Sequence, residues 1–120
     1  LSFSGCGLSD AAKKGEKATG LFHKHMKMGN ENAMLDLIHE DLMEAEGPKV
    51  KKLIHSIANE LKVKEVKKET GFNTNINNGV ATVSLTYSVV LENGDVLSER
   101  MVLKDSKDGT MKVSGLNYQQ

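Results

Sequence analysis

Several residue types are scarce in this chain of 120 residues, and each scarcity excludes a class of protein. A single cysteine cannot form a disulfide within the chain or a thiolate cage for a metal ion. Tryptophan is absent and aromatic residues make up 4%, which argues against a surface that stacks on bases or sugars. Sixteen Lys and Arg balance sixteen Asp and Glu, so the excess of positive charge that nucleic acid requires is missing. No apolar run is long enough to cross a membrane as a helix.

The residues that are present describe one globular domain. Hydrophobic residues make up 38% and charged residues 27%, which is typical of a folded protein rather than of a disordered or collagen-like chain. A chain of this length forms one domain with its own core. We expect a single α+β domain over residues 9–120, preceded by a segment of different character.

That segment, residues 1–8, contains the lone cysteine in the sequence Ser4-Gly5-Cys6. Small residues directly before a cysteine, with apolar residues upstream, resemble the lipobox of bacterial lipoproteins, although Phe3 departs from the usual leucine. The resemblance implies that Cys6 carries lipid, with acyl chains such as palmitate, and that residues 1–8 are a signal-peptide remnant, lipobox and tether. It also implies a location in the bacterial cell envelope, at the periplasmic or extracellular face of a membrane. The alternative is a buried, inert cysteine, which the flanking glycines make less favourable.

The first part of the domain has helical periodicity. Ser9 or Asp10 can cap a first helix that ends near Met28. Apolar and small residues recur every three or four positions along one side of it, which predicts a core-facing stripe. The stripe begins with small residues and ends with large ones: Ala11, Ala12, Gly15, Ala18, Phe22 and Met26.

Two further helices are expected before the strands. Asn30 can cap a second helix that runs to about Met43. Gly47-Pro48 then breaks the chain, and Pro48 suits the first turn of a third helix that ends near Leu61.

From residue 63 the periodicity changes to two, which predicts strands. We expect strands over residues 63–77, 80–91, 96–104 and 110–118, joined by turns rich in Asn, Asp and Gly. Alternate residues of the second strand, from Ala81 to Leu91, are apolar or Tyr87. The opposite face of this strand is rich in hydroxyl groups, so we expect helices to cover the sheet on the apolar side only: Thr82, Ser84, Thr86 and Ser88.

Helices followed by an antiparallel meander predict N-terminal helices packed on one face of a curved four-stranded sheet. This order, the sequence Ser4-Gly5-Cys6 and the closing strands at 96–104 and 108–115 resemble small bacterial lipoproteins of unknown function with a cystatin-like or nuclear-transport-factor-2-like fold. Thr110-Met111 stands where those proteins usually have Trp. The resemblance implies a fold and a cell-surface setting, but no reaction, because this superfold includes enzymes, binding domains and assembly domains.

Enzymes of this superfold place an acid, often with Tyr or His, in the cone between sheet and helices. Glu99 is in phase with the apolar residues of the third strand, and Tyr87 is on the same predicted face. Glu99 is therefore either an inward acid or a charge at a strand edge, and we favour the second. If a pocket exists in the cone, we expect it to be lined by Phe22, Met26, Leu85, Tyr87, Glu99 and Met101. We assign no catalytic residue.

No metal or other cofactor is expected. The rings of His23 and His25 point about 200° apart on a helix, so they cannot share an ion. We interpret them, like His39 and His55, as histidines at a helix rim or facing solvent. The sequence has no HExxH motif, no Cys/His set and no complete calcium loop.

Charge is unevenly placed along the helical part. Six acids and no Lys or Arg lie between residues 31 and 46, whereas seven Lys and two Glu lie between residues 49 and 68. Two neighbouring helices of opposite sign would attract each other weakly, which is the interpretation we favour. The alternative is that the Lys-rich stretch faces anionic lipid headgroups.

Together these features favour a lipid-anchored, non-enzymatic domain that binds a small apolar ligand or a protein partner. The membrane, through lipid on Cys6, is its other expected partner, and nucleic acid is not expected. Two alternatives stay open. One is a small enzyme that uses Glu99 and Tyr87, and the other is a homodimerising assembly module that pairs through the hydroxyl-rich sheet face.

Overall fold

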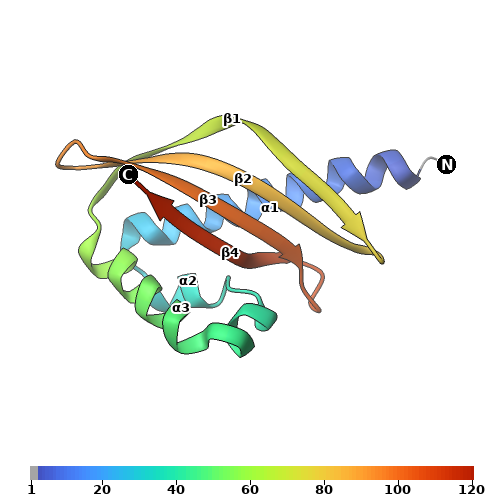
Figure 1. The fold of residues 1–120 in the computed structure, drawn as a ribbon, viewed down its shortest axis with the longest axis horizontal. Helices are drawn as coiled ribbons and strands as arrows, with labels where there is room; N and C mark the ends of the chain where they lie inside the picture. The colour runs from blue at the N-terminus through green and yellow to red at the C-terminus, as the bar shows by residue number, and fades with distance from the viewer. Residues whose placement is uncertain (1–2) are drawn as a thin grey trace.

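A computed structural model describes the backbone of residues 3–120 and the side chains of residues 10–69 and 71–120. The strands form one antiparallel sheet in chain order, with β1 and β4 at its edges. α1 lies behind the sheet, across its inner face, whereas α2 and α3 lie beside β4 (Figure 1). The predicted α+β fold is therefore confirmed. Its elements are α1 (Phe3–Met28), α2 (Glu31–Leu35), α3 (Glu40–Glu60), β1 (Val63–Asn77), β2 (Val80–Leu91), β3 (Val96–Asp105) and β4 (Met111–Gln119).

The strands begin and end within one residue of the predicted positions. β2 alternates regularly between buried and half-buried residues, as its two-residue period predicts. Asn78 and Gly79 both have positive φ, at 53° and 79°, in the tight turn between β1 and β2. Asn and Gly tolerate this conformation, which is why the sequence places the turn so clearly.

The second predicted helix is much shorter than expected, because α2 ends at Leu35 rather than near Met43. The chain then passes beside β4, where Ile38 forms a parallel bridge with Val113. The backbone N–H of His39 donates to the Val113 carbonyl at 2.8 Å, and the Val113 N–H donates to the Leu37 carbonyl at 2.8 Å. These long-range hydrogen bonds replace helical ones, so a new helix begins after His39, whose Nδ1 accepts a hydrogen bond from the Asp41 N–H.

The predicted interruption near Gly47-Pro48 is present inside α3, where two helical segments meet without a loop between them. The interruption is reduced to a kink at Glu46, where φ is −140° and ψ is 34°. Pro48 therefore lies in the first turn of the second segment, as predicted, where its missing N–H costs no helical hydrogen bond. α1 begins before the predicted cap at Ser9 or Asp10, so that prediction is wrong. Such a cap contributes only about 1 kcal/mol, which is too little to fix where a helix begins.

The core lies between α1, α3 and the inner face of the sheet. Small residues on the inner side of α1 allow the helix to come close to β2, and a Cβ atom on Gly15 would lie 3.1 Å from Val83 Cγ1. Farther along α1 the buried residues become large, and Phe22 and Met26 fill the space between the helix and the sheet. The largest completely or almost completely buried side chains are Phe22, Met26, Met34, Ile54, Ile57, Leu85, Met101, Leu103 and Glu99.

Candidate functional site

A row of four side chains crosses the inner face of the sheet, with one residue from each strand. Strand register pairs Lys68 with Tyr87, Tyr87 with Glu99, and Glu99 with Tyr118. Residues that are paired across antiparallel strands point to the same face. We call these four residues the inner row.

One stripe of α1 contacts the inner row residue by residue. α1 advances about 5.4 Å per turn and neighbouring strands lie about 4.8 Å apart, so each turn of the helix reaches the next strand. The pairs, in order, are Glu16 with Lys68, Thr19 with Tyr87, His23 with Glu99, and Met26 with Tyr118. α1 is thereby aligned with all four strands.

Glu99 is the centre of this arrangement and has no exposed surface. Its Oε1 lies 2.5 Å from His23 Nε2, and its Oε2 accepts a hydrogen bond from the Tyr118 hydroxyl at 2.6 Å. Our interpretation of Glu99 as a charge at a strand edge is therefore wrong. β3 is a central strand whose inner face is covered by α1, and a carboxylate can be buried there because both of its oxygens are hydrogen-bonded.

The interpretation of His23 and His39 as rim or solvent-facing histidines is also wrong. His23 is 8% exposed and His39 is 3% exposed. Each is buried with at least one ring nitrogen bonded to a protein group. His23 bonds to Glu99, and His39 Nε2 lies 2.8 Å from the Asp105 carbonyl oxygen.

Tyr87 extends the polar cluster beside Glu99. Its hydroxyl lies 2.6 Å from Thr19 Oγ1, which itself donates to the Glu16 carbonyl, so Tyr87 is the donor in the first of these bonds. Its ring meets the His23 ring edge-on, with 4.5 Å between ring centres. Burial raises the pKa of Tyr87, and burial together with the neighbouring Glu99 charge holds the pKa of Tyr118 well above its usual range. Both phenols therefore keep their protons at neutral pH.

The two ends of the inner row differ. At the β1 end, Lys68 and Glu16 form an exposed ion pair, and hydrogen bonding to Glu16 raises the pKa of Lys68. At the β4 end, the Tyr118 hydroxyl lies 3.9 Å from Met26 Sδ. The charges of Lys68 and Glu16 are therefore exposed to water, whereas the carboxylate of Glu99, at the centre of the row, is enclosed.

The structure brings all six residues of the predicted pocket together in the core. Tyr87 is the most exposed of them, at 7%, and it is Thr19, His23 and Tyr118 that complete the polar cluster around it and Glu99. These three partners are absent from the pocket predicted from the sequence. A spacing of four places Thr19 and His23 on the buried side of α1, and this signal was available. The pairing of Tyr118 with Glu99 was not available, because a β-bulge at Val102/Leu103 shifts the register.

Two of the surface hollows outside this cluster have largely apolar walls. One, of about 340 Å³, lies between α3 and β4 and is lined mainly by Ile38, Leu42, Val50, Leu53 and Leu116. The other, of about 230 Å³, lies between α1 and the β3–β4 turn and is lined mainly by Ala18, Leu21, Leu37 and Met111. Both have apolar walls and charged residues at the rim.

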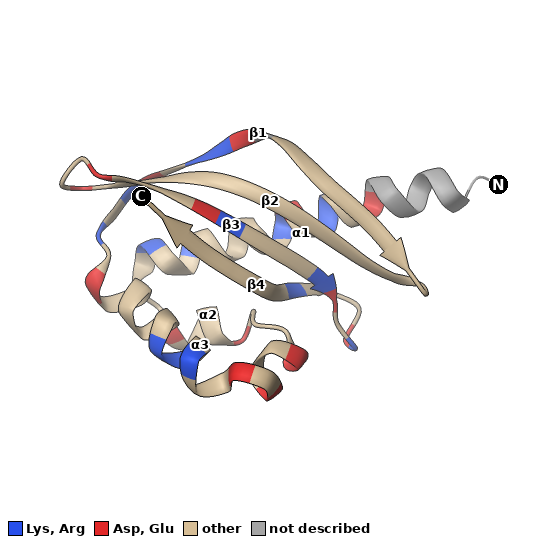
Figure 2. Cartoon of the chain, viewed as in Figure 1, with Lys and Arg blue, Asp and Glu red and all other residues tan. Residues whose placement is uncertain are grey.

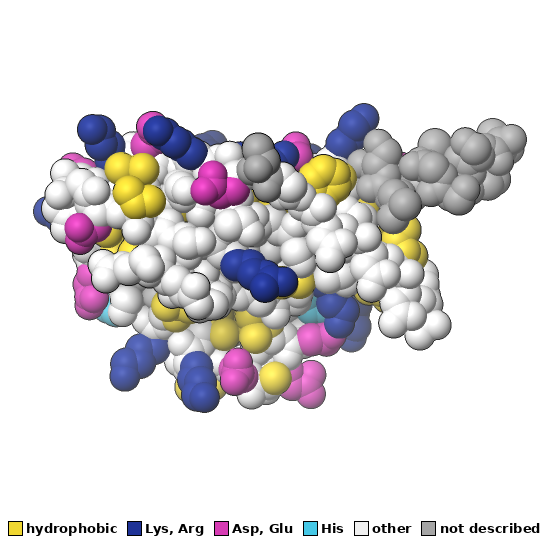
Figure 3. Space-filling view, turned by 45° about the horizontal axis from the view of Figure 1, so that its top comes forward, with side chains coloured by type: hydrophobic (Ala, Val, Ile, Leu, Met, Phe, Trp, Pro, Cys, Tyr) yellow, Lys and Arg dark blue, Asp and Glu magenta, His cyan; other side chains and the backbone are white. Residues whose placement is uncertain are grey.

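The outer face of the sheet is open and mostly uncharged (Figure 3). Thr82, Ser84, Thr86 and Ser88 lie there, half-buried by their neighbours, as predicted. Among the described side chains, no three His, Cys, Asp or Glu residues are grouped so as to hold a metal ion. Within the described residues, no helix combines the length and the apolar character needed to cross a bilayer. Cys6 lies outside the residues whose side chains are described.

This architecture is the nuclear-transport-factor-2-like fold, in which helices pack on a curved antiparallel sheet. The chain is similar to a crystal structure described as a putative ketosteroid isomerase from Shewanella frigidimarina NCIMB 400. The TM-score is 0.58, the sequence identity is 16%, and the match covers 86% of this chain and 92% of the other. At that identity the likeness shows the fold alone. No protein-family model and no curated protein sequence matches the chain.

Proposed function

We propose that this chain is a lipid-anchored, non-enzymatic domain of the bacterial cell envelope that binds a protein partner at its surface. The observation that carries the proposal is the enclosed cluster around Glu99. A general base must reach the proton that it removes. The carboxylate of Glu99 is fully buried, and both of its oxygens are already held by His23 and Tyr118.

The surface that best fits a protein partner is the hollow between α3 and β4. β4 is an edge strand, and an edge strand can pair with an added extended segment. The bridge between Ile38 and Val113 supports this, because it shows one extended residue already paired with β4. Beyond that bridge, apolar side chains such as Leu53 and Leu116 offer a place for an apolar residue of the partner.

A photo-crosslinking experiment tests the location of the partner site. A benzophenone amino acid replaces Leu53 in the hollow or, as a matched control, Leu21 on α1. The two leucines have similar exposure, 37% and 39%. We expect a discrete protein adduct in the native host from position 53 and none from position 21. A protein adduct from position 21 alone would place the partner site elsewhere.

A separate experiment tests the anchor. Metabolic labelling with a radioactive fatty acid should label the wild-type protein and leave Cys6→Ala unlabelled. Equal labelling of both proteins, or labelling of neither in the native host, would remove the lipid anchor from the proposal.

A second candidate function is a proton-transfer enzyme that uses the same cluster. One arrangement favours it, because a buried carboxylate lies next to a histidine and two protonated tyrosines. The fold is shared with a protein described as a putative ketosteroid isomerase. Isomerisation of an unconjugated 3-oxosteroid, followed by the absorbance of the conjugated product, tests it. Turnover that Glu99→Gln abolishes would favour the enzyme over the binding domain.

A further inference from the structure

The outward side of α1 carries an unusual set of exposed residues. At about 100° per residue, they fall within an arc of about 140° that faces away from the sheet. The set, which we call the lysine face, is Lys13, Lys14, Lys17, Leu21, Lys24, Lys27 and Met28. Asp10 is the one acid in the described part of this arc.

The cations of the lysine face are largely without partners. Lys14 lies 3.7 Å from Asp105 at one border of the arc. Lys13, Lys17, Lys24 and Lys27 form no ion pair with any described residue, and the other acid of this part of α1, Glu16, is bonded to Lys68. The charges of this face are therefore available to an external anion.

Two exposed apolar side chains lie among these lysines. Leu21 is 39% exposed and Met28 is 65% exposed. The hollow of about 230 Å³ between α1 and the β3–β4 turn opens beside Leu21 and Lys17. Cationic and apolar groups on one face of a helix are typical of helices that lie at a lipid interface.

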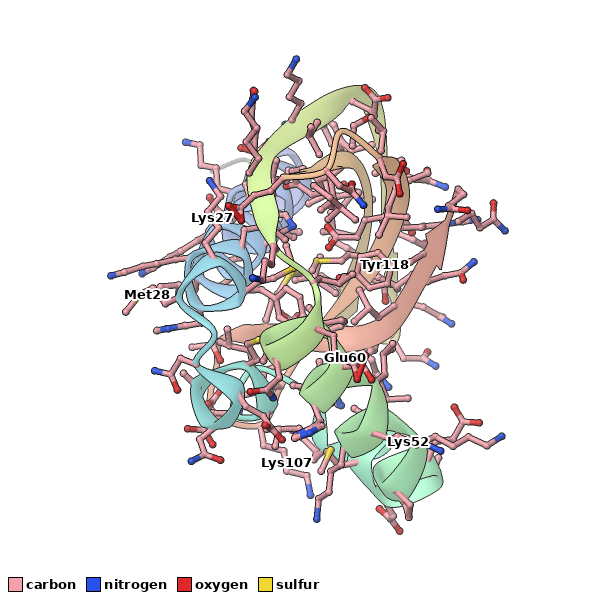
Figure 4. The ribbon with its side chains drawn as sticks, turned by 90° about the vertical axis from the view of Figure 1, so that its left-hand side faces the viewer. Lys27, Met28, Lys52, Glu60, Lys107 and Tyr118 are labelled. Atoms are coloured by element: carbon pink, nitrogen blue, oxygen red, sulfur yellow. The ribbon has the colours of Figure 1, made fainter. Side chains whose placement is uncertain are left out.

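The position of α1 leaves this face accessible. Basic residues mark α1 in the cartoon of Figure 2. Figure 4 shows Met28 on the side of α1 turned away from the sheet. Lys27 and Met28 also border a hollow that they share with the end of α3 and the start of β1. The residues of the lysine face are exposed along the described length of α1.

We propose that the lysine face of α1 lies on an anionic lipid bilayer. The lysines contact headgroup phosphates, and Leu21 and Met28 enter the boundary with the acyl chains. This inference deepens the anchor in the proposed function, because Cys6 lies in the first turns of the same helix. In this orientation the outer face of the sheet points away from the membrane.

The structure favours α1 over the lysines of α3, at residues 49–52, as the lipid-facing surface. Lys62 and Lys64, later in the Lys-rich stretch at residues 49–68, line a hollow beside Lys27 and Met28 and so lie next to the lysine face. Acidic residues of α3, from Glu40 to Glu46, precede the lysines of that helix. Lys52 lies on the opposite side of the molecule from Lys27 and Met28 (Figure 4). The two surfaces therefore cannot rest on one membrane, which makes α3 a matched control.

Vesicle co-sedimentation of the full chain with Cys6→Ser tests the proposal without any lipid anchor. The vesicles contain phosphatidylcholine alone, or phosphatidylcholine mixed with phosphatidylglycerol. We expect binding to the mixed vesicles only, weakened by salt. Lys17→Gln/Lys24→Gln should reduce the affinity about tenfold or more, whereas Lys51→Gln/Lys52→Gln should change it less than about twofold. Leu21→Gln should also weaken binding.

Equal binding to both kinds of vesicle, no binding at low salt, or an equal loss in the two lysine pairs would overturn the proposal. The substituted lysines and Leu21 are exposed, so these changes should leave the thermal unfolding of the Cys6→Ser protein unaltered, and a melting curve checks that each variant folds. Because the test protein carries no acyl chain, its outcome is independent of fatty-acid labelling at Cys6. If Cys6 is labelled with fatty acid but the protein does not bind vesicles, the lipid anchor stands and the proposal that the lysine face contacts the bilayer is wrong.

Discussion

The two sides of α1 use similar polar groups in opposite ways. On the side that faces the sheet, Thr19 and His23 are buried, and each makes a specific contact with the inner row. On the other side, Lys17 and Lys24 are exposed and form no ion pair within the described chain. The comparison teaches that burial decides what a polar group does. An enclosed group must have a partner within the fold, whereas an exposed one is free to bind something else.

Removal of the Glu99 carboxylate, which bonds to the buried side of α1, should give the largest loss of stability. Glu99→Ala leaves His23 and the Tyr118 hydroxyl without their partner and opens a cavity, so we expect the free energy of unfolding to fall by about 3 kcal/mol or more. Urea denaturation measures this. Glu99→Gln keeps the shape and one acceptor and should lose less. A loss below about 1 kcal/mol in Glu99→Ala would show that the cluster does not hold α1 in place.

Two glycines of α1 provide a direct comparison of its sides. A Cβ atom at Gly15 would lie 3.1 Å from the buried Val83, whereas nothing lies within 4 Å of one at Gly20. Gly15→Ala should lower the free energy of unfolding by about 1 kcal/mol, because overpacking exceeds the gain in helix propensity. Gly20→Ala should raise it by about 0.5–1 kcal/mol. Thermal unfolding of both variants measures the difference, and a gain in both would mean that α1 is less closely packed than the structure shows.

The Tyr118 hydroxyl should make stability sensitive to alkaline pH. Its pKa is raised in the folded state, so above about pH 10 an unfolded chain releases a proton that the folded chain keeps. The stability that this group contributes is therefore complete below pH 10 and decreases as pH rises. Tyr118→Phe should lose about 1 kcal/mol at neutral pH and show a flatter alkaline decline in urea denaturation. If the stability of Tyr118→Phe declines as steeply as that of the wild type, groups other than Tyr118 cause the alkaline decline.

The exposed end of the inner row should contribute least. Glu16 raises the pKa of Lys68, and such a contribution would be lost only as pH rises through the folded-state pKa of the lysine. Both side chains are nearly half exposed, however, so solvent screens the pair. Glu16→Gln should leave the melting temperature at neutral pH unchanged within error. A loss comparable to that of Tyr118→Phe would contradict the distinction between buried and exposed polar contacts.

Local signals were sufficient for most of the fold. The two-residue period of β2 and the Asn78-Gly79 turn are determined by neighbouring residues, and the strands lie where the sequence predicts them. The length of α2 is not determined in this way. It is set by hydrogen bonds between Leu37, His39 and the distant Val113, which no local pattern encodes.

The same distinction between local and long-range signals applies to the candidate site. Glu99 and Tyr87 share a face because they are in phase within their strands, and this was predictable. The hydrogen bond from Tyr118 to Glu99 depends on the register of β3 and β4, which the bulge at Val102/Leu103 alters. The burial of Glu99 depends in turn on the position of α1 across the sheet. A charged residue in an apolar phase is therefore ambiguous until its partners are known.

The pairing of α1 with the inner row also constrains the order of folding. Thr19 and Tyr87 are 68 residues apart in the chain, His23 and Glu99 are 76 apart, and Met26 and Tyr118 are 92 apart. Contacts between such distant residues require closure of long loops, which slows folding. During synthesis α1 emerges well before the strands that satisfy its buried polar groups. A chain that cannot complete its core until β4 has been made therefore reaches its native structure only after nearly all of it has been synthesised.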